Sequence, residues 1–312
     1  MIPTDNKELF EQYYQNEYDF NTTTLTDSDI AGIKKLVREK RVNYALAPIG
    51  TKVFEWILSE NPNLRLELVD FDSEKIDGML YIPTKGNERA YIILNSNKPL
   101  INQIFTAMHE YYHYERDYAQ IKNNPHICNF ASLENVNEKR ASRFAAEFLL
   151  PEEALKIEVR MYRVRLKENK DTELSFADYA ILSILLTLRY QLPLKAVIYR
   201  LYEENYILNI EKYIDNYAFI KNVLQEVNIY KKSFRELYSN INPFFETDSM
   251  IYNKMKNAYL SGLASREEII RDAIILDLDV NVIKDFFEDI SLSDEDEDDS
   301  DLVSIIQKKW RN

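Results

Sequence analysis

Two histidines and a glutamate in the segment His109-Glu110-Tyr111-Tyr112-His113 have the types and spacing of a zinc site. Residues four apart lie about 40° from each other on a helix, so the imidazoles of His109 and His113 can converge on one ion. Glu110 then lies on the flank of the helix, where its carboxylate can reach a water on the metal without binding the metal itself. The segment therefore predicts the zinc-binding helix of a metallopeptidase, with Glu110 as the general base.

A catalytic zinc site needs a third protein ligand, and glutamates downstream of this segment could supply it. A histidine six residues after His113 would complete one class of site, but Ala119 stands there. The next predicted helix offers Glu134, Glu138 and Glu147. At 100° per residue Glu147 points about 180° away from Glu138, whereas Glu134 shares the face of Glu138. We choose Glu138 as the third ligand, with Glu134 as the alternative to be tested.

The helix of Glu138 also carries two small residues on a neighbouring face, Ala141 and Ala145. Small side chains allow two helices to approach closely, as shared metal ligation demands. Ordinary core packing explains alanines equally well, so only their coincidence with Glu138 supports the ligand assignment.

Two further residues are candidates for contacts with a substrate. His126 follows the turn that ends the zinc-binding helix and could donate to the oxyanion of a tetrahedral intermediate, although a loop histidine without a role is the alternative. Asn95 ends the apolar run Ile92-Ile93-Leu94-Asn95, which could present a strand edge to an extended substrate. A buried central strand is the competing interpretation of that run.

The elements that must position these residues are mostly helical. Helical periodicity covers 5–20, 26 to about 60, 100–122, 134–150 and nearly all of 152–290. Strand patterns occur at 64–68, 76–82 and 90–95 and predict a small antiparallel sheet. The expected fold class is α+β, with a mostly helical, zincin-like peptidase domain followed by an all-helical C-terminal region.

Composition narrows the functional class further. The 312 residues are 46% hydrophobic and 29% charged, as in a folded globular protein, with a net charge of -13. That charge opposes direct binding of nucleic acid. The single cysteine, Cys128, cannot form an internal disulfide, and no segment has the length and hydropathy of a signal peptide or membrane span. We therefore expect a cytoplasmic protein without membrane attachment.

Four motifs occur in a characteristic order: Ile76-Asp77-Gly78, the strand ending at Asn95, Phe105-Thr106-Ala107-Met108-His109-Glu110-x-x-His113, and Glu138-x-x-Ala141-x-x-Phe144-Ala145-Ala146-x-x-Leu149-Leu150-Pro151. This order resembles the ImmA/IrrE family of metallo-endopeptidases over roughly residues 30–210. The resemblance implies a cytosolic, Zn²⁺-dependent, gluzincin-like enzyme. It also implies a protein substrate, typically a helix-turn-helix repressor of mobile-element or stress-response genes.

Two residues depart from the pattern of that family. Tyr112 stands where the family usually has glycine, which predicts altered packing or a narrowed cleft. Ser142 stands where the family usually has asparagine or aspartate, and a hydroxyl orients a histidine ligand less firmly than an amide or a carboxylate does. Asp117, on the face of His113, could take over that role, although a solvent-facing charge is the competing interpretation.

Three regions are expected along the chain: a peptidase domain at 1–210, a helical domain at 211–290 and an acidic, disordered tail at 291–312. Ser265 is predicted to cap a helix of the second region, with an apolar stripe at Ile269, Ile270, Ala273 and Ile274.

The leading function is a zinc endopeptidase that cleaves a specific regulatory protein, with a basic DNA-binding repressor as the expected partner. The alternative is a binding-only anti-repressor or toxin-antitoxin component that keeps the peptidase fold. All the core chemical residues are present, which favours the enzyme. The sequence does not determine the oligomeric state.

Overall fold

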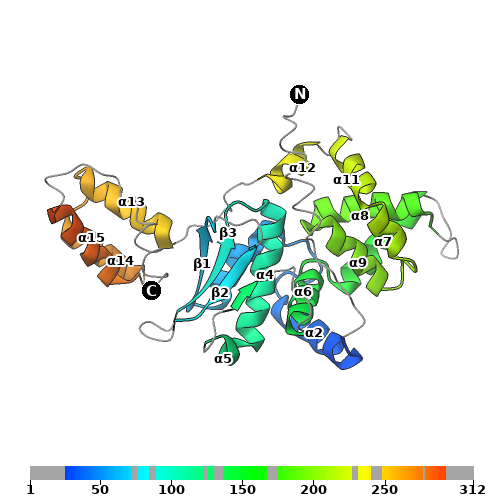
Figure 1. Cartoon of the computed structure of the whole chain (residues 1–312), viewed down its shortest axis with the longest axis horizontal. Helices are drawn as coiled ribbons and strands as arrows, with labels where there is room; N and C mark the ends of the chain where they lie inside the picture. The colour runs from blue at the N-terminus through cyan, green and yellow to red at the C-terminus, as the bar shows by residue number, and fades with distance from the viewer. Residues whose placement is uncertain are drawn as a thin grey trace. The chain divides into compact units, whose positions relative to one another are not determined.

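The computed structural model describes residues 25–71, 76–83, 89–122, 126–128, 136–166, 174–226, 231–239, 248–276 and 278–292. The chain divides into two compact units, Met1–Phe244 and Phe245–Asn312 (Figure 1). The predicted helix at 5–20, the alternative ligand Glu134 and the acidic run that begins at Ser293 lie outside the described residues.

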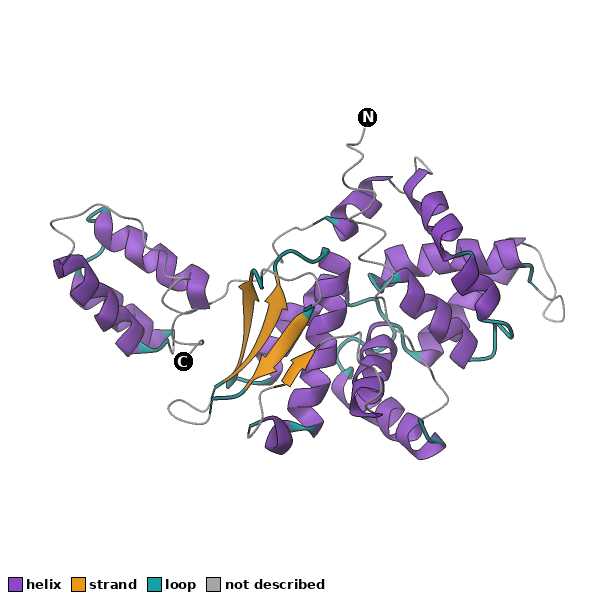
Figure 2. Cartoon of the chain, viewed as in Figure 1, coloured by secondary structure: helices purple, strands orange, loops and turns teal. Residues whose placement is uncertain are grey.

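A four-stranded mixed sheet lies in the first unit, with the strand order β1-β3-β2-β4 (Figure 2). Its strands are β1 (Leu64–Val69), β2 (Gly78–Tyr81), β3 (Ala90–Asn95) and β4 (His126–Cys128). β3 pairs in parallel with β1, whereas β2 is antiparallel to both β3 and β4.

The prediction of a purely antiparallel sheet is therefore wrong. β3 is the most apolar of the strands, and Ile92, Ile93 and Leu94 are all fully buried. A strand buried on both faces belongs in the middle of a sheet, so β3 lies between β1 and β2 and separates these consecutive strands. The chain reverses direction between β1 and β2 and again between β2 and β3, so β3 runs in the same direction as β1.

Helix α4 (Leu100–Arg116) packs against β2 and β3 and carries the segment His109–His113. It begins after Pro99, whose missing N–H costs nothing at a helix start. Every residue from Leu100 to His113 is buried. Gly78 permits the close approach, since a Cβ there would lie 2.6 Å from the side chain of Thr106. The predicted helix at 100–122 is interrupted at Asp117, and α5 (Tyr118–Ile121) follows.

The predicted helix at 26–60 is also interrupted. Its parts are α2 (Asp27–Lys40), the 3-10 turn η2 (Gly50–Lys52) and α3 (Val53–Glu60). Pro48 disfavours helical continuation through the residue before it, and Gly50 has a positive φ of 50°. Arg41 holds the intervening turn by donating to the carbonyls of Ala45 and Ala47.

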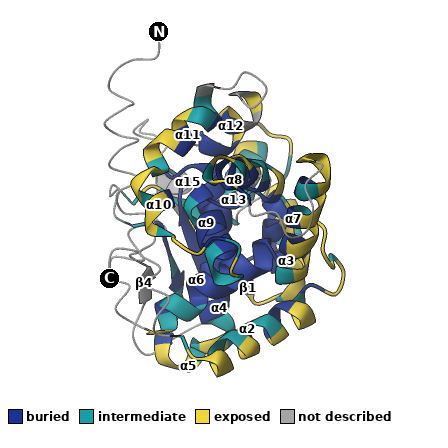
Figure 3. Cartoon of the chain, turned by 90° about the vertical axis from the view of Figure 1, so that its right-hand side faces the viewer, coloured by how far each residue is buried: buried dark blue, intermediate teal, exposed yellow. Residues whose placement is uncertain are grey.

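Four further helices of this unit follow the sheet in the chain. They are α6 (Val136–Leu149), α7 (Glu152–Leu166), α8 (Phe176–Tyr190) and α9 (Leu194–Glu203). Figure 3 shows the buried faces of α4, α6 and α9 in dark blue. In the described part of the chain no single helix meets the length and hydropathy needed to cross a membrane; α8 and α9 do so only as a pair bent by 116°.

The first unit extends beyond the boundary expected at residue 210. It includes α10 (Glu211–Asp215), α11 (Tyr217–Glu226) and α12 (Lys231–Tyr238). α11 and α12 pack against α8, and α12 also contacts α4, where the amide of Leu100 donates to the carbonyl of Ser239 at 3.1 Å. Phe234 and Leu237 are buried in this contact region.

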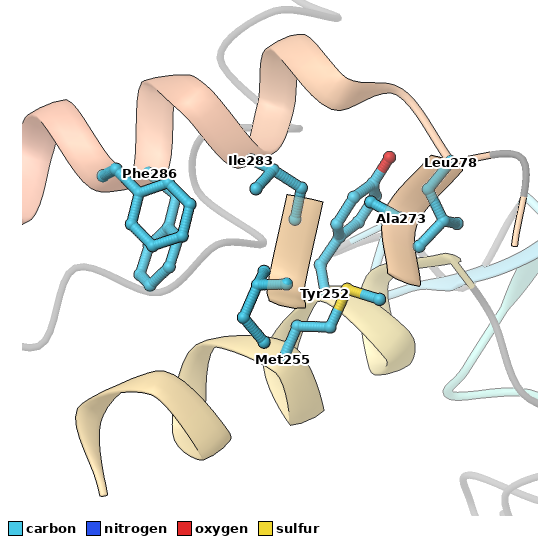
Figure 4. Close-up of a cluster of buried hydrophobic side chains, with 8 residues drawn as sticks. Tyr252, Met255, Ala273, Leu278, Ile283 and Phe286 are labelled. Atoms are coloured by element: carbon cyan, nitrogen blue, oxygen red, sulfur yellow. The ribbon is translucent and has the colours of Figure 1, made fainter. Parts of the chain in front are cut away.

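The second unit contains α13 (Asp248–Leu260), α14 (Arg266–Ile275) and α15 (Val280–Leu292). Tyr252, Met255, Ile283 and Phe286 belong to its apolar core (Figure 4). The predicted cap of α14 is present, because the Ser265 hydroxyl accepts from the N–H of Glu268 in a capping box. Of the predicted stripe, Ile269 and Ala273 are buried, Ile270 packs against the core, and Ile274 is exposed.

Candidate metal centre

The side chains of His109, His113 and Glu138 meet in the interior of the first unit. Nε2 of His109 lies 3.1 Å from Oε2 of Glu138, and Nε2 of His113 lies 3.2 Å from Oε1. The two histidine Nε2 atoms are 3.2 Å apart. All three residues are buried, and one ligand atom from each lies within 4.8 Å of the others. Two imidazole nitrogens and a carboxylate oxygen gathered in this way could hold a metal ion.

Two packed helices bring these groups together. His109 and His113 are one turn apart on α4, and Glu138 lies in the first turn of α6, which packs against α4. Ala141 and Ala145 of α6 are completely buried and keep the two helix backbones close.

The outward-facing nitrogen of each histidine also has a partner. Nδ1 of His113 lies 2.7 Å from Oδ2 of Asp117, and Nδ1 of His109 lies 3.2 Å from Oγ of Ser142. A hydrogen bond at Nδ1 fixes the ring orientation and directs Nε2 toward a metal. Both residues that the sequence suggested for this role, Asp117 and Ser142, therefore contact a histidine of the candidate site.

Glu110 lies beside this group with no exposed surface. Neither of its carboxylate oxygens has a hydrogen-bond partner among the described residues. A buried carboxylate without a partner is costly, so a polar group beside Glu110 would stabilise it. A metal with a coordinated water would supply such a group, and the residues present fit a bound metal.

The electrostatics of the site favour a positive charge. Burial alone would lower the pKa of His113, but its hydrogen bonds to Asp117 and Glu138, together with the charge of Glu110, raise that pKa to about 10. A group of carboxylates that stabilises an imidazolium so strongly would also stabilise a metal cation at the same place.

Comparison with protein families identifies the segment that carries this site. Residues 60–202 match the IrrE N-terminal-like domain of the peptidase M78 family. This segment is an IrrE N-terminal-like domain. It runs from the last residue of α3 into α9 and contains both α4 and α6. A metallopeptidase-type function agrees with its buried His-His-Glu group. No curated protein matches the chain.

The IrrE-like domain also places a buried ion pair near the site, which the sequence did not single out. Nζ of Lys98 lies 3.1 Å from Oδ1 of Asp77, and both residues are buried. Burial raises the pKa of Asp77 despite Lys98, and the charges of His109 and Glu110 also act on this carboxyl. Asp77 immediately precedes β2 within the motif Ile76-Asp77-Gly78. An acidic residue at the start of an apolar strand is the one feature of the sequence that could have indicated a buried ion pair here.

The two residues predicted to contact a substrate, Asn95 and His126, have different outcomes. The Asn95 side chain donates to the carbonyl of Ile76 at 2.7 Å, and its strand β3 lies between β1 and β2. The prediction of a substrate-binding edge at Asn95 is therefore wrong, and the buried central strand is the observed arrangement. His126 pairs with Leu80 through β4, but its side chain lies outside the described part of the structure.

Glu147 lies in a separate buried network, here called the arginine cluster: Arg143, Glu147, Arg200, Glu203 and Glu204. Oε2 of Glu147 lies 2.7 Å from Arg143 and 2.8 Å from Arg200. These arginines lower the pKa of Glu147, although burial acts in the opposite direction. Glu147 is thus held by cations outside the His-His-Glu group, as its angular separation from Glu138 predicted.

Proposed function

We propose that the chain is a zinc-dependent metallo-endopeptidase that cleaves a specific regulatory protein. The observation that carries this proposal is the buried group of His109, His113 and Glu138 with the unpartnered carboxylate of Glu110 beside it. An IrrE N-terminal-like domain around this group supports peptide hydrolysis as the reaction.

The donor set suits zinc better than magnesium or calcium. Two imidazole nitrogens and one carboxylate leave a fourth position open, as in catalytic zinc sites, whereas magnesium and calcium prefer oxygen ligands. When bound there, zinc would lower the pKa of a coordinated water to about 7 and polarise the carbonyl of the substrate.

The residues of the chain then have distinct roles. Glu110 takes a proton from the attacking water as the new C–O bond forms, and it passes a proton to the leaving amine as the C–N bond breaks. Asp117 and Ser142 hold His113 and His109 in the orientation that directs both Nε2 atoms inward. The complete burial of Glu110 limits the water around its carboxylate, which keeps proton transfer specific.

A cytoplasmic, basic, DNA-binding repressor is the proposed substrate. The resemblance to the ImmA/IrrE family suggests a helix-turn-helix protein, and the net charge of -13 would attract a basic partner. The attraction between the negatively charged chain and a basic repressor can be tested separately. Association of the chain with the repressor should slow as salt rises, and a rate that does not change between low and high salt would contradict it.

Cleavage itself is tested with the full chain, added zinc and a repressor encoded beside its gene. Mass spectrometry should show one or a few defined products with the unmodified chain and none with Glu110→Gln, while both proteins retain zinc. Undiminished cleavage by Glu110→Gln would refute the catalytic assignment. Tight repressor binding without cleavage by the zinc-loaded chain would instead favour the binding-only alternative.

A further inference from the structure

A pocket adjoins the candidate metal centre through Asp117. It has a volume of about 340 Å³ and is lined by residues of α2, α4 and α6 and by Asp117. Asp117 lines this pocket and also lies 2.7 Å from His113, so one carboxylate belongs to both places. The first turns of α2 form the opposite wall, including Asp29 and Gly32.

Tyr112 is the residue that marks this pocket as a binding site. Its side chain is only 7% exposed and packs against Phe144 with the ring centroids 5.4 Å apart. The hydroxyl has no hydrogen-bond partner among the residues that the structure describes, although buried phenols usually find one.

Tyr112 shares this pocket with four charged residues. Asp117, Arg140, Arg116 and Asp29 line the pocket, as Tyr112 itself does. A ligand in the pocket can therefore contact both Tyr112 and these charged groups.

One positive charge in the pocket is available to a ligand. Arg140 is engaged by Asp29 at 2.9 Å, and Asp117 is engaged by His113. Arg116 is exposed and makes no ion pair within the described part of the chain. Because Asp29 contacts Arg140 and Asp117 contacts His113, Arg116 can take one negative charge from a ligand, whereas a dianion would meet repulsion from Asp29 and Asp117.

The remaining wall gives the ligand its second property. Ile33 and Leu36 of α2 line the pocket and are 3% and 5% exposed. They add two apolar side chains to a lining that also contains Tyr112 and Arg116. Concave sites that combine apolar side chains with a few polar groups are typical of small-molecule binding.

We propose that this pocket binds a small monocarboxylate, with its carboxylate between the Arg116 guanidinium and the Tyr112 hydroxyl and its apolar body against Ile33 and Leu36. A planar guanidinium matches a carboxylate in a two-point hydrogen bond, which favours this anion over others of the same charge. The bound molecule would join α2 to α4 beside the carboxylate that holds His113. An effect of the bound monocarboxylate on peptide cleavage rests on the proposed function, whereas the binding of the monocarboxylate does not.

The experiment uses the purified full chain and four probes: benzoate, butyrate, acetate and inorganic phosphate. Isothermal titration should show saturable binding of benzoate or butyrate, weaker binding of acetate, which lacks an apolar body, and no binding of phosphate. Arg116→Gln should weaken binding about tenfold or more, since it removes a charged hydrogen-bond donor. Tyr112→Phe should weaken it about threefold to tenfold while keeping the ring packed on Phe144.

Arg165→Gln is the matched control, because Arg165 is exposed on α7 and does not line this pocket. This variant should bind the probes as the unmodified chain does. No saturable binding of benzoate and butyrate, tighter binding of phosphate than of either, or equal binding by Arg116→Gln and Tyr112→Phe would each overturn the proposal. Because the readout is binding, a chain that cleaves no protein but binds benzoate would separate this proposal from the proposed function.

Discussion

Helix α6 contributes to two buried polar clusters that balance their charges in different ways. In the arginine cluster, Arg200 lies 2.8 Å from both Glu147 and Glu203, and Arg143 lies 3.2 Å from Glu203. Each of these acids faces an arginine that never loses its charge. In the candidate metal centre, Glu138 contacts His109 and His113, and Glu110 has no hydrogen-bond partner among the described residues.

The difference separates a structural network from a site that needs a ligand. Buried charges are tolerated when they are paired, as they are around Arg200. Around Glu110 the carboxylates outnumber the fixed cations among the described residues, so a metal cation could be held there. Both clusters contain buried carboxylates, so burial and charge alone do not distinguish them. They differ in the counter-charge, which is arginine in one cluster and histidine in the other.

The largest expected difference between the clusters is in metal binding. Glu138→Gln should abolish stoichiometric zinc binding because it removes one of three ligands, whereas Glu147→Gln should leave zinc binding unchanged. A competition titration with a coloured zinc chelator measures both variants. Equal losses in the two variants would show that the clusters are not functionally distinct.

The arginine cluster is expected to contribute to the stability of the fold. Arg200→Met leaves the buried Glu147 and the partly buried Glu203 and Glu204 with fewer counter-charges and should cost about 3–5 kcal/mol of unfolding free energy. Urea unfolding of the metal-free chain measures this loss. Arg165→Met, at an exposed position, should change the same quantity by less than about 0.5 kcal/mol. A loss below about 1 kcal/mol in Arg200→Met would contradict the structural role of the cluster.

A smaller effect is expected from the residues that orient the histidines. Asp117→Asn should weaken zinc affinity about tenfold to a hundredfold, because Asp117 makes the shorter contact, 2.7 Å to Nδ1 of His113. Ser142→Ala should have a lesser effect, since its hydroxyl lies 3.2 Å from Nδ1 of His109. The two affinities are compared by the same chelator competition, and a larger loss in Ser142→Ala would reverse this ranking.

The smallest predicted effect concerns acid stability. The arginines lower the pKa of Glu147 in the folded chain below its ordinary value near 4.5. Its contribution to stability is therefore fully present above that value and is lost as the pH falls through the lower folded pKa. Glu147→Gln should flatten the decline of stability below about pH 4.5, as measured by urea unfolding at several pH values. An unchanged decline would assign acid sensitivity to other carboxylates.

The sequence predicted local relationships well. Helical spacing alone predicted that His109 and His113 share a face of a helix and that Glu147 points away from Glu138, because these relations depend only on the period of the helix. The same reasoning predicted the cap at Ser265. The mostly helical α+β class is likewise confirmed.

Relations between distant segments were harder to predict. Strand patterns do not specify which strands are neighbours, so the parallel pairing of β1 with β3 was missed. The break between α2 and α3 required attention to Pro48 and Gly50 rather than to apolar periodicity. The pair of Asp77 and Lys98 joins residues separated by both β2 and β3, and neither residue shows its partner in the sequence.

The zinc content of the purified full-length chain tests the central claim most directly. After dialysis against metal-free buffer, elemental analysis should find about one zinc per chain in the unmodified protein and in Glu110→Gln, and none in Glu138→Gln. A folded, unmodified chain that binds no zinc when the metal is supplied, or a Glu138→Gln variant that keeps it, would contradict the assignment of this buried group as a metal centre.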